Sequence, residues 1–150
     1  MKIQQFGLPL LPGLLLLVGT LPGAADVIQT QSAITGDVEV DVIKSAAKEG
    51  ILTIQLAYRN KGNAEAALLY EWSTVYFLDT QDKKKYQILK DSQGVFLAAP
   101  DDGYHRINTK VPPGGKLIVW FKFPAPPATT TKVNLVVPGV LPFEDLPISQ

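Results

Sequence analysis

The sequence predicts an all-β domain, an antiparallel sandwich of about seven or eight short strands. Three observations support this prediction. Apolar and polar residues alternate with a period of two in several segments. Turn signals rich in glycine and proline recur about eight to twelve residues apart. No segment offers the long helix that a parallel α/β sheet requires.

The first half of the domain contains three predicted strands. Residues 38–42 alternate valine with acidic residues, which is typical of a strand with one solvated face. Residues 52–58 alternate apolar with mainly polar side chains and end at a turn signal in 60–63. Residues 64–69 have a composition suited to one helical turn but are too short to nucleate a helix alone. Aromatic and β-branched residues in 72–78 predict the third strand.

Five more strands are predicted in the second half. Residues 86–89 return from a polar turn at 79–84 and form a hairpin with 72–78. The other four predicted strands cover residues 95–97, 106–111, 117–123 and 133–137. The tail, 141–148, is not counted among them, because it is apolar enough to dock but too rich in proline for a central strand.

The first 25 residues have the order of a secretory signal peptide. Lys2 is followed by an apolar run at 6–18 and then by small residues. Gly23 and Ala25 suit signal peptidase, so we expect cleavage after Ala25. The apolar run is shorter than the roughly 20 residues of a spanning helix, and we expect no stable membrane span after cleavage. A single domain at 26–150 in the periplasm or outside the cell is therefore expected.

The composition narrows the possible chemistry. The chain has 14 basic and 14 acidic residues, so it has no electrostatic footprint for nucleic acid or anionic lipid. It has no cysteine and a single histidine, His105, which is too few for the usual transition-metal sites. We expect no cofactor and no metal. Calcium held by Asp101 and Asp102 is a weaker alternative, because the loop lacks the acidic spacing of an EF-hand.

The same residues predict that the protein is not an enzyme. None of its serines stands in a Gly-x-Ser-x-Gly elbow. The carboxylate pairs Asp101-Asp102 and Glu144-Asp145 are adjacent in the sequence, and adjacent strand residues point to opposite faces of a sheet. They are therefore poor candidates for a paired acid and base.

Aromatic residues are the candidates for contact with a partner. Sandwich cores commonly contain a tryptophan, so both Trp72 and Trp120 have a core interpretation and a surface interpretation. An exposed aromatic side chain beside loops would mark a partner site. The possible contact residues are Trp120, Tyr70, Tyr76 and Tyr104.

Three segments resemble an uncharacterised immunoglobulin-like domain of bacterial exported and envelope proteins. They are residues 86–94, residues 111–127 with their Pro-Pro-Gly-Gly turn, and residues 137–148. Domains of this group occur alone or beside OmpA-like peptidoglycan-binding domains. The resemblance implies an immunoglobulin-like sandwich and an envelope location, and it brings no catalytic residues.

The leading hypothesis is therefore an exported binding or structural module of the bacterial cell envelope, with an envelope protein or glycan as partner. Sheet-edge backbone or loop aromatics would make the contacts. The alternative is a carbohydrate-binding or carrier module in which Tyr70, Tyr76 and Trp120 stack on sugar. Three coplanar exposed aromatics on one sheet would favour that alternative.

Overall fold

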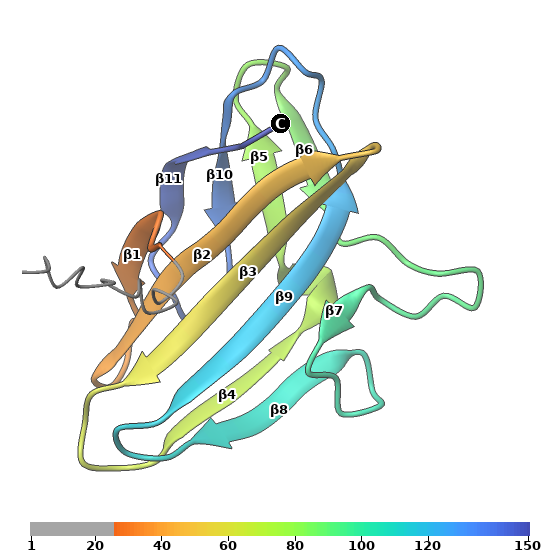
Figure 1. The fold of residues 1–150 in the computed structure, drawn as a ribbon. Helices are drawn as coiled ribbons and strands as arrows, with labels where there is room; N and C mark the ends of the chain where they lie inside the picture. Colours follow the sequence, from red (N-terminus) through yellow and green to blue (C-terminus); the bar gives the residue numbers. More distant parts are fainter. Residues whose placement is uncertain (1–25) are drawn as a thin grey trace, which may run out of the picture.

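The computed structural model describes residues 26–150, which form eleven β-strands and one short 3-10 helix (Figure 1). No α-helix occurs within this range. The elements are β1 (Gln29–Ser32), β2 (Val38–Lys48), β3 (Ile51–Asn60), β4 (Ala66–Glu71), η1 (Trp72–Thr74), β5 (Tyr76–Asp79), β6 (Lys84–Gln87), β7 (Ala98–Ala99), β8 (Arg106–Val111), β9 (Lys116–Pro124), β10 (Lys132–Val136) and β11 (Phe143–Pro147).

The front layer of the sandwich is a five-stranded antiparallel sheet in the order β1-β2-β3-β9-β7. Its long strands β2, β3 and β9 run side by side across the molecule in Figure 1. The β2–β3 hairpin closes at Glu49 and Gly50, which both have positive φ, at 53° and 78°. A two-residue turn with positive φ at both positions matches the right-handed twist of the strands that it joins.

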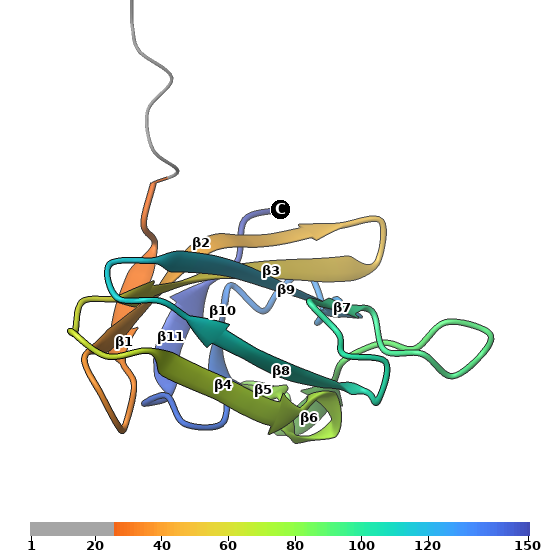
Figure 2. The same cartoon turned by 90° about the horizontal axis from the view of Figure 1, so that it is seen from below.

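The back layer is divided into two sheets. One has four strands in the order β11-β10-β5-β6, and the other is the β4–β8 ribbon. Figure 2 shows this layer facing the front sheet. β4 and β5 are consecutive, but η1 separates them, and the Val75 N–H donates to the Trp72 carbonyl at 3.1 Å. The chain therefore changes direction after β4, so β5 pairs with β10 and β6 while β4 pairs with β8.

One hydrophobic cluster fills the space between the layers and joins all three sheets. Trp72 lies in it with no exposed surface, and its ring packs edge-on against Tyr70 and Phe121, with centroids 5.7 and 5.9 Å away. Alternate residues of β9 point inward, which buries Val119, Phe121 and Phe123. Of the two interpretations left open for each tryptophan, the structure shows the core one for Trp72. Trp120 lies on the opposite face of β9, so the core interpretation does not hold for it.

The predicted all-β sandwich is confirmed, with eleven strands within residues 26–150 instead of seven or eight. The strand predicted at 106–111 has the same bounds in the structure, and the predicted hairpin is the β5–β6 pair. Residues 64–69 contribute most of a strand, β4, and include no helical turn. The strand predicted from residue 72 starts instead as η1, because the chain leaves one sheet there and enters another.

The expected signal peptide and its cleavage after Ala25 lie outside the described residues. Over residues 26–150, the structure contains no helix with the length and apolarity needed to cross a membrane.

Candidate functional site

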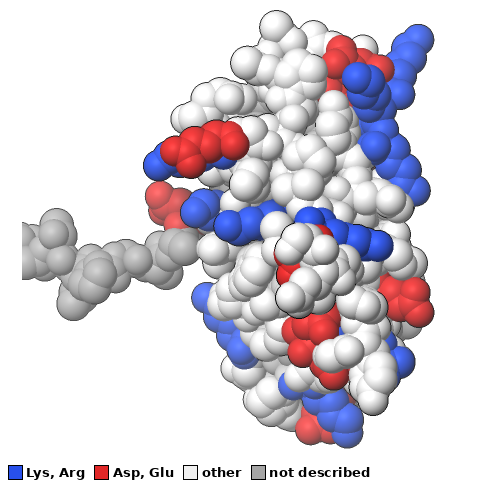
Figure 3. Space-filling model, turned by 90° about the vertical axis from the view of Figure 1, so that its right-hand side faces the viewer, with Lys and Arg blue, Asp and Glu red and all other residues white. Residues whose placement is uncertain are grey.

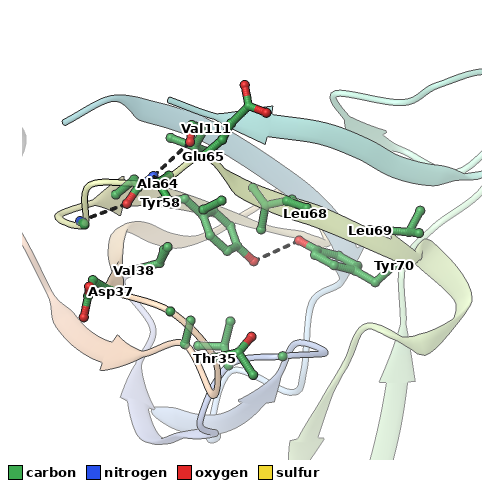
Figure 4. Close-up of a pocket in the computed structure, with 18 of the residues that line it drawn as sticks. Thr35, Asp37, Val38, Tyr58, Ala64, Glu65, Leu68, Leu69, Tyr70 and Val111 are labelled. Atoms are coloured by element: carbon green, nitrogen blue, oxygen red, sulfur yellow. Dashed lines mark hydrogen bonds between the residues drawn. The ribbon is translucent and has the colours of Figure 1, made fainter. Parts of the chain in front are cut away.

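The division of the back layer leaves a cavity of about 680 Å³, here called the split cavity. Strand β4 forms one side through residues 66–70, and the β1–β2 loop forms the facing side. The loop between β3 and β4 and the turn at 138–140 complete the rim. Figure 4 shows β4 on one side of the cavity and Thr35, Asp37 and Val38 on the other. Side chains from the inner face of the front sheet, including Tyr58, form the floor.

Buried Asn60 shapes the rim next to β4. Its side-chain amide donates to the carbonyls of Ala64 (2.7 Å) and Val111 (2.9 Å), and its side-chain oxygen accepts from the Gly62 N–H at 3.0 Å. These bonds satisfy a buried polar group and hold the β3–β4 loop against the end of β8. The loop also contacts the facing side, because the Lys61 N–H donates to the Asp37 carbonyl at 2.8 Å.

Two tyrosine hydroxyls meet in the split cavity. The hydroxyl oxygens of Tyr58 and Tyr70 are 3.0 Å apart, and both residues line the cavity (Figure 4). Burial raises the pKa of both phenols above the ordinary value, so both are neutral at physiological pH. A neutral hydroxyl has one proton to donate. The pair uses one proton, and within residues 26–150 neither hydroxyl makes another hydrogen bond to protein, so one O–H can serve a ligand.

The rim of the split cavity is acidic. Asp37 and Glu65 line it, and no lysine or arginine of residues 26–150 does. Glu65 pairs with Lys110 at 2.8 Å, and this exposed ion pair is screened by solvent. Lys61 borders an adjoining hollow, where it pairs with Glu39 at 3.0 Å. A cavity lined by both apolar and polar side chains, with carboxylates on its rim, suits an uncharged or basic ligand better than an acidic one.

Charges elsewhere on the surface are mixed. Figure 3 shows one face on which basic and acidic side chains are interspersed among uncharged ones. On the outer surface of the front sheet, Arg59 bonds Asp41 at 2.5 Å and Glu39 at 2.7 Å. The hydrogen bond from Arg59 holds the pKa of the Asp41 carboxyl below its usual value, against the opposing effect of burial.

The aromatic residues selected from the sequence do not form one platform. Tyr70 is 8% exposed and faces inward, which corrects its proposed place on an exposed surface. Trp120 points outward from the front sheet, between Gln55 and Ala99. Tyr76 belongs to β5 in the back layer and carries the Lys85 ammonium over its ring at 4.0 Å.

The sugar-stacking surface expected from Tyr70, Tyr76 and Trp120 is therefore not formed, because successive strand residues face opposite sides of a sheet and the three residues belong to different sheets. Tyr104 is 74% exposed in a loop, with the Arg106 guanidinium 5.5 Å from the centroid of its ring. Of the four selected residues, only Tyr70 lines the split cavity.

Asp101 and Asp102 use their carboxylate oxygens within the fold. Asp101 accepts from the Trp72 indole (2.5 Å) and from the Gly103 N–H (2.7 Å). Asp102 accepts from the Tyr104 N–H (2.9 Å) and from the Arg106 guanidinium (2.6 Å). In the described part of the chain, no group of three or more His, Cys, Asp or Glu side chains is arranged to hold a metal ion.

Sequence patterns did not reveal the split cavity. In β4 the inward residues Ala66, Leu68 and Tyr70 alternate with Ala67 and Leu69, so both faces are apolar and the period of two is hidden. The walls also come from segments far apart in the sequence, and only the topology brings them together.

Comparisons with known proteins identify similar structures only. No protein-family model and no curated protein matches the chain. The yjhA protein from Bacillus subtilis has a similar fold with a TM-score of 0.47 and 14% identity, over 75% of this chain and 79% of that one. A functionally unknown protein from Listeria monocytogenes EGD-e gives a TM-score of 0.45 and 11% identity, over 81% of this chain and 84% of that one.

Proposed function

We propose that this protein is an exported immunoglobulin-like binding module of the bacterial cell envelope, and that it holds its ligand in the split cavity. The observation that supports this most directly is the cavity itself. Its volume of about 680 Å³ falls within the roughly 300–1,000 Å³ typical of ligand pockets. Apolar walls with a few placed polar groups are also typical of such pockets.

The chemistry of the lining indicates the kind of ligand. Val38, Leu68 and Val140 offer apolar contact, and the Tyr58–Tyr70 pair offers one hydrogen-bond donor at the floor. The acidic rim disfavours a negatively charged ligand. The ligand is therefore an uncharged or basic group with an apolar body and at least one hydrogen-bond acceptor.

Three sequence features support export and binding without catalysis. The order of residues 1–25 is that of a signal peptide. The resemblance to immunoglobulin-like domains of exported proteins suggests a periplasmic or extracellular partner, either an envelope protein or a glycan. The chain has no cysteine thiol and one histidine that could act as base for a serine, and none of its serines stands in a Gly-x-Ser-x-Gly elbow.

Binding of N-phenyl-1-naphthylamine, a neutral fluorescent probe, tests the cavity. We expect the folded 26–150 domain to enhance its fluorescence at a single saturable site. Ala66→Leu adds a side chain to a partly buried lining position and should weaken binding at least about tenfold, a loss of roughly 1.4 kcal/mol. Ile118→Ala removes an exposed apolar side chain from the outer face of the front sheet and should leave binding unchanged.

Thermal melts must show that each variant is folded before its binding is compared. Ala64→Leu, at an exposed position of the rim, provides a second filled cavity if Ala66→Leu lowers stability. Equal probe affinity for the wild type and both filled variants would show that the ligand site lies elsewhere.

A further inference from the structure

Strand β4 is paired along one edge only. It pairs with β8 from Ala66 to Glu71, and the Trp72 N–H continues the ladder by donating to the His105 carbonyl at 3.0 Å. Within residues 26–150, no other strand pairs with β4. Backbone groups alternate in direction along an antiparallel strand. Because Trp72 bonds toward β8, the N–H and C=O groups of Ala67 and Leu69 point away from it.

This unpaired edge borders the split cavity. Five consecutive residues of β4, 66–70, line the cavity, and the β1–β2 loop forms the facing side. At about 3.3 Å per residue, these five residues span roughly 16 Å. An extended ligand chain of about five residues could therefore lie along this edge of β4, where two backbone N–H groups point toward it.

The segments that border the cavity carry exposed apolar side chains. Leu69 of β4 is 63% exposed. Ile34 and Leu141 are 66% and 48% exposed; they do not line the cavity but are next in sequence to Ala33 and Val140, which do. Exposed large apolar side chains in the segments that border a cavity favour a partner that covers them.

We propose that the split cavity receives an extended peptide segment of another protein, which pairs with β4 as an added strand. The backbone of β4 supplies the ladder bonds, while the walls accept alternate apolar side chains. The spare tyrosine hydroxyl donates to a peptide carbonyl. Asp37 on the rim favours a segment that is uncharged or basic, whereas the charge of Glu65 is offset by its ion pair with Lys110. This inference rests on the proposed function, because it names the ligand class of the same cavity.

The probe for this proposal is a displayed library of random nine-residue peptides, selected on the folded 26–150 domain. We expect enriched peptides to alternate apolar residues with other residues and to lack Asp and Glu. Binding should protect the Ala67 and Leu69 amides from hydrogen exchange, since these are the donors that an added strand would engage. Methylation of alternate peptide nitrogens should weaken the binding at least about tenfold, because it removes ladder bonds.

Proline substitution tests the edge itself. Leu69→Pro removes an edge N–H that does not bond β8, and proline is tolerated at such edge positions. Leu69→Pro should bind the selected peptides at least about tenfold more weakly than Leu69→Ala does, because Leu69→Ala loses the same side chain but keeps the N–H. Asn108→Pro, at a position that points away from β4 on the other edge of the ribbon, is the matched control and should bind like the wild type.

The outcomes separate this proposal from the proposed function. If no peptide is enriched but the neutral probe still binds, the cavity is a small-molecule site, and strand addition is wrong. Equal affinity of Leu69→Pro and Leu69→Ala for selected peptides would also overturn it. A wild-type dimer in sedimentation that becomes monomeric in Leu69→Pro would identify a second copy as the occupant and contradict the proposal. Failure of both the probe and the peptides would remove the proposed function as well.

Discussion

The hydroxyls of Tyr58 and Tyr70 belong both to the core and to the floor of the split cavity, so each residue has a structural role beside the binding role proposed for it. Tyr58 is 1% exposed and Tyr70 8%, and their hydroxyl oxygens lie 3.0 Å apart. A buried hydroxyl that loses its partner keeps the cost of desolvation. The pair therefore restricts which substitutions the cavity floor tolerates.

We expect Tyr70→Phe to lower the free energy of unfolding by about 1–2 kcal/mol, because it leaves the Tyr58 hydroxyl without its protein partner. The double variant Tyr58→Phe/Tyr70→Phe should lose less than the sum of the two single variants, since it removes both polar groups together. Urea unfolding of the four proteins gives this double-mutant cycle. Strictly additive losses would mean that the two hydroxyls are not coupled.

The lowered pKa of Asp41 predicts that the stability of the protein depends on pH. The hydrogen bond from Arg59 lowers the pKa of Asp41, while burial opposes this effect and a further bond from Thr30 (2.7 Å) adds to it. The pKa in the folded state is thus below the unfolded value of about 3.9. The stabilisation is fully present above that unfolded value and is lost as pH falls through the lower folded value.

Urea unfolding at a series of pH values from about 7 to 2 measures this effect. Asp41→Asn should be less stable than the wild type at neutral pH and should lose less stability on acidification. Glu144→Gln, which changes an exposed carboxyl in β11, should follow the wild-type profile. Parallel acid profiles for Asp41→Asn and the wild type would show that Asp41 does not contribute.

At the scale of elements, the accuracy of the sequence-based predictions followed the regularity of the alternation. The strands at β3, β9 and β10 were predicted to within one or two residues at each end. β2 extends to Lys48, beyond the predicted end at residue 42, because a register shift between Val42 and Lys44 breaks its alternation. β1 was missed because its four residues, Gln-Thr-Gln-Ser, contain no apolar side chain.

The β2–β3 hairpin supplies a prediction at this scale. Glu49 has φ of 53°, a conformation that costs most L-residues roughly 1–2 kcal/mol, whereas asparagine tolerates it and favours this turn when followed by glycine. Glu49→Asn should therefore raise the free energy of unfolding by up to about 1 kcal/mol. Gly50→Ala should lower it, since Gly50 has φ of 78° although a Cβ would meet no atom within 4 Å.

Urea unfolding at constant pH compares the two turn variants with the wild type. Glu144→Gln again serves as a control for the loss of a charge, and it should change the stability much less than Glu49→Asn. A Gly50→Ala variant as stable as the wild type would contradict the strained turn. Both variants leave the split cavity untouched, because neither residue lines it.

At the scale of the whole molecule, the candidate site is a product of topology. Its walls combine the β1–β2 loop, the β3–β4 loop, β4 and the β10–β11 turn, which no local pattern links. The division of the back layer follows from η1, which redirects the chain after β4. Tyr70 was selected from the sequence as a contact residue, but its partner Tyr58 was read only as a position in an alternating strand.

Export is the remaining property of the whole molecule that the sequence predicts. Cleavage after Ala25 would leave every strand described here in the mature chain, because β1 begins at Gln29. It would also keep the hydrogen bond from the Ile28 N–H to the Val42 carbonyl (2.8 Å), which ties the start of the domain to β2. The mature chain should therefore fold like the domain at 26–150. N-terminal sequencing of the protein from fractionated native cells should give a chain that starts at or near Asp26. Intact Met1 in the cytoplasmic fraction would contradict export and would move the search for a peptide partner inside the cell.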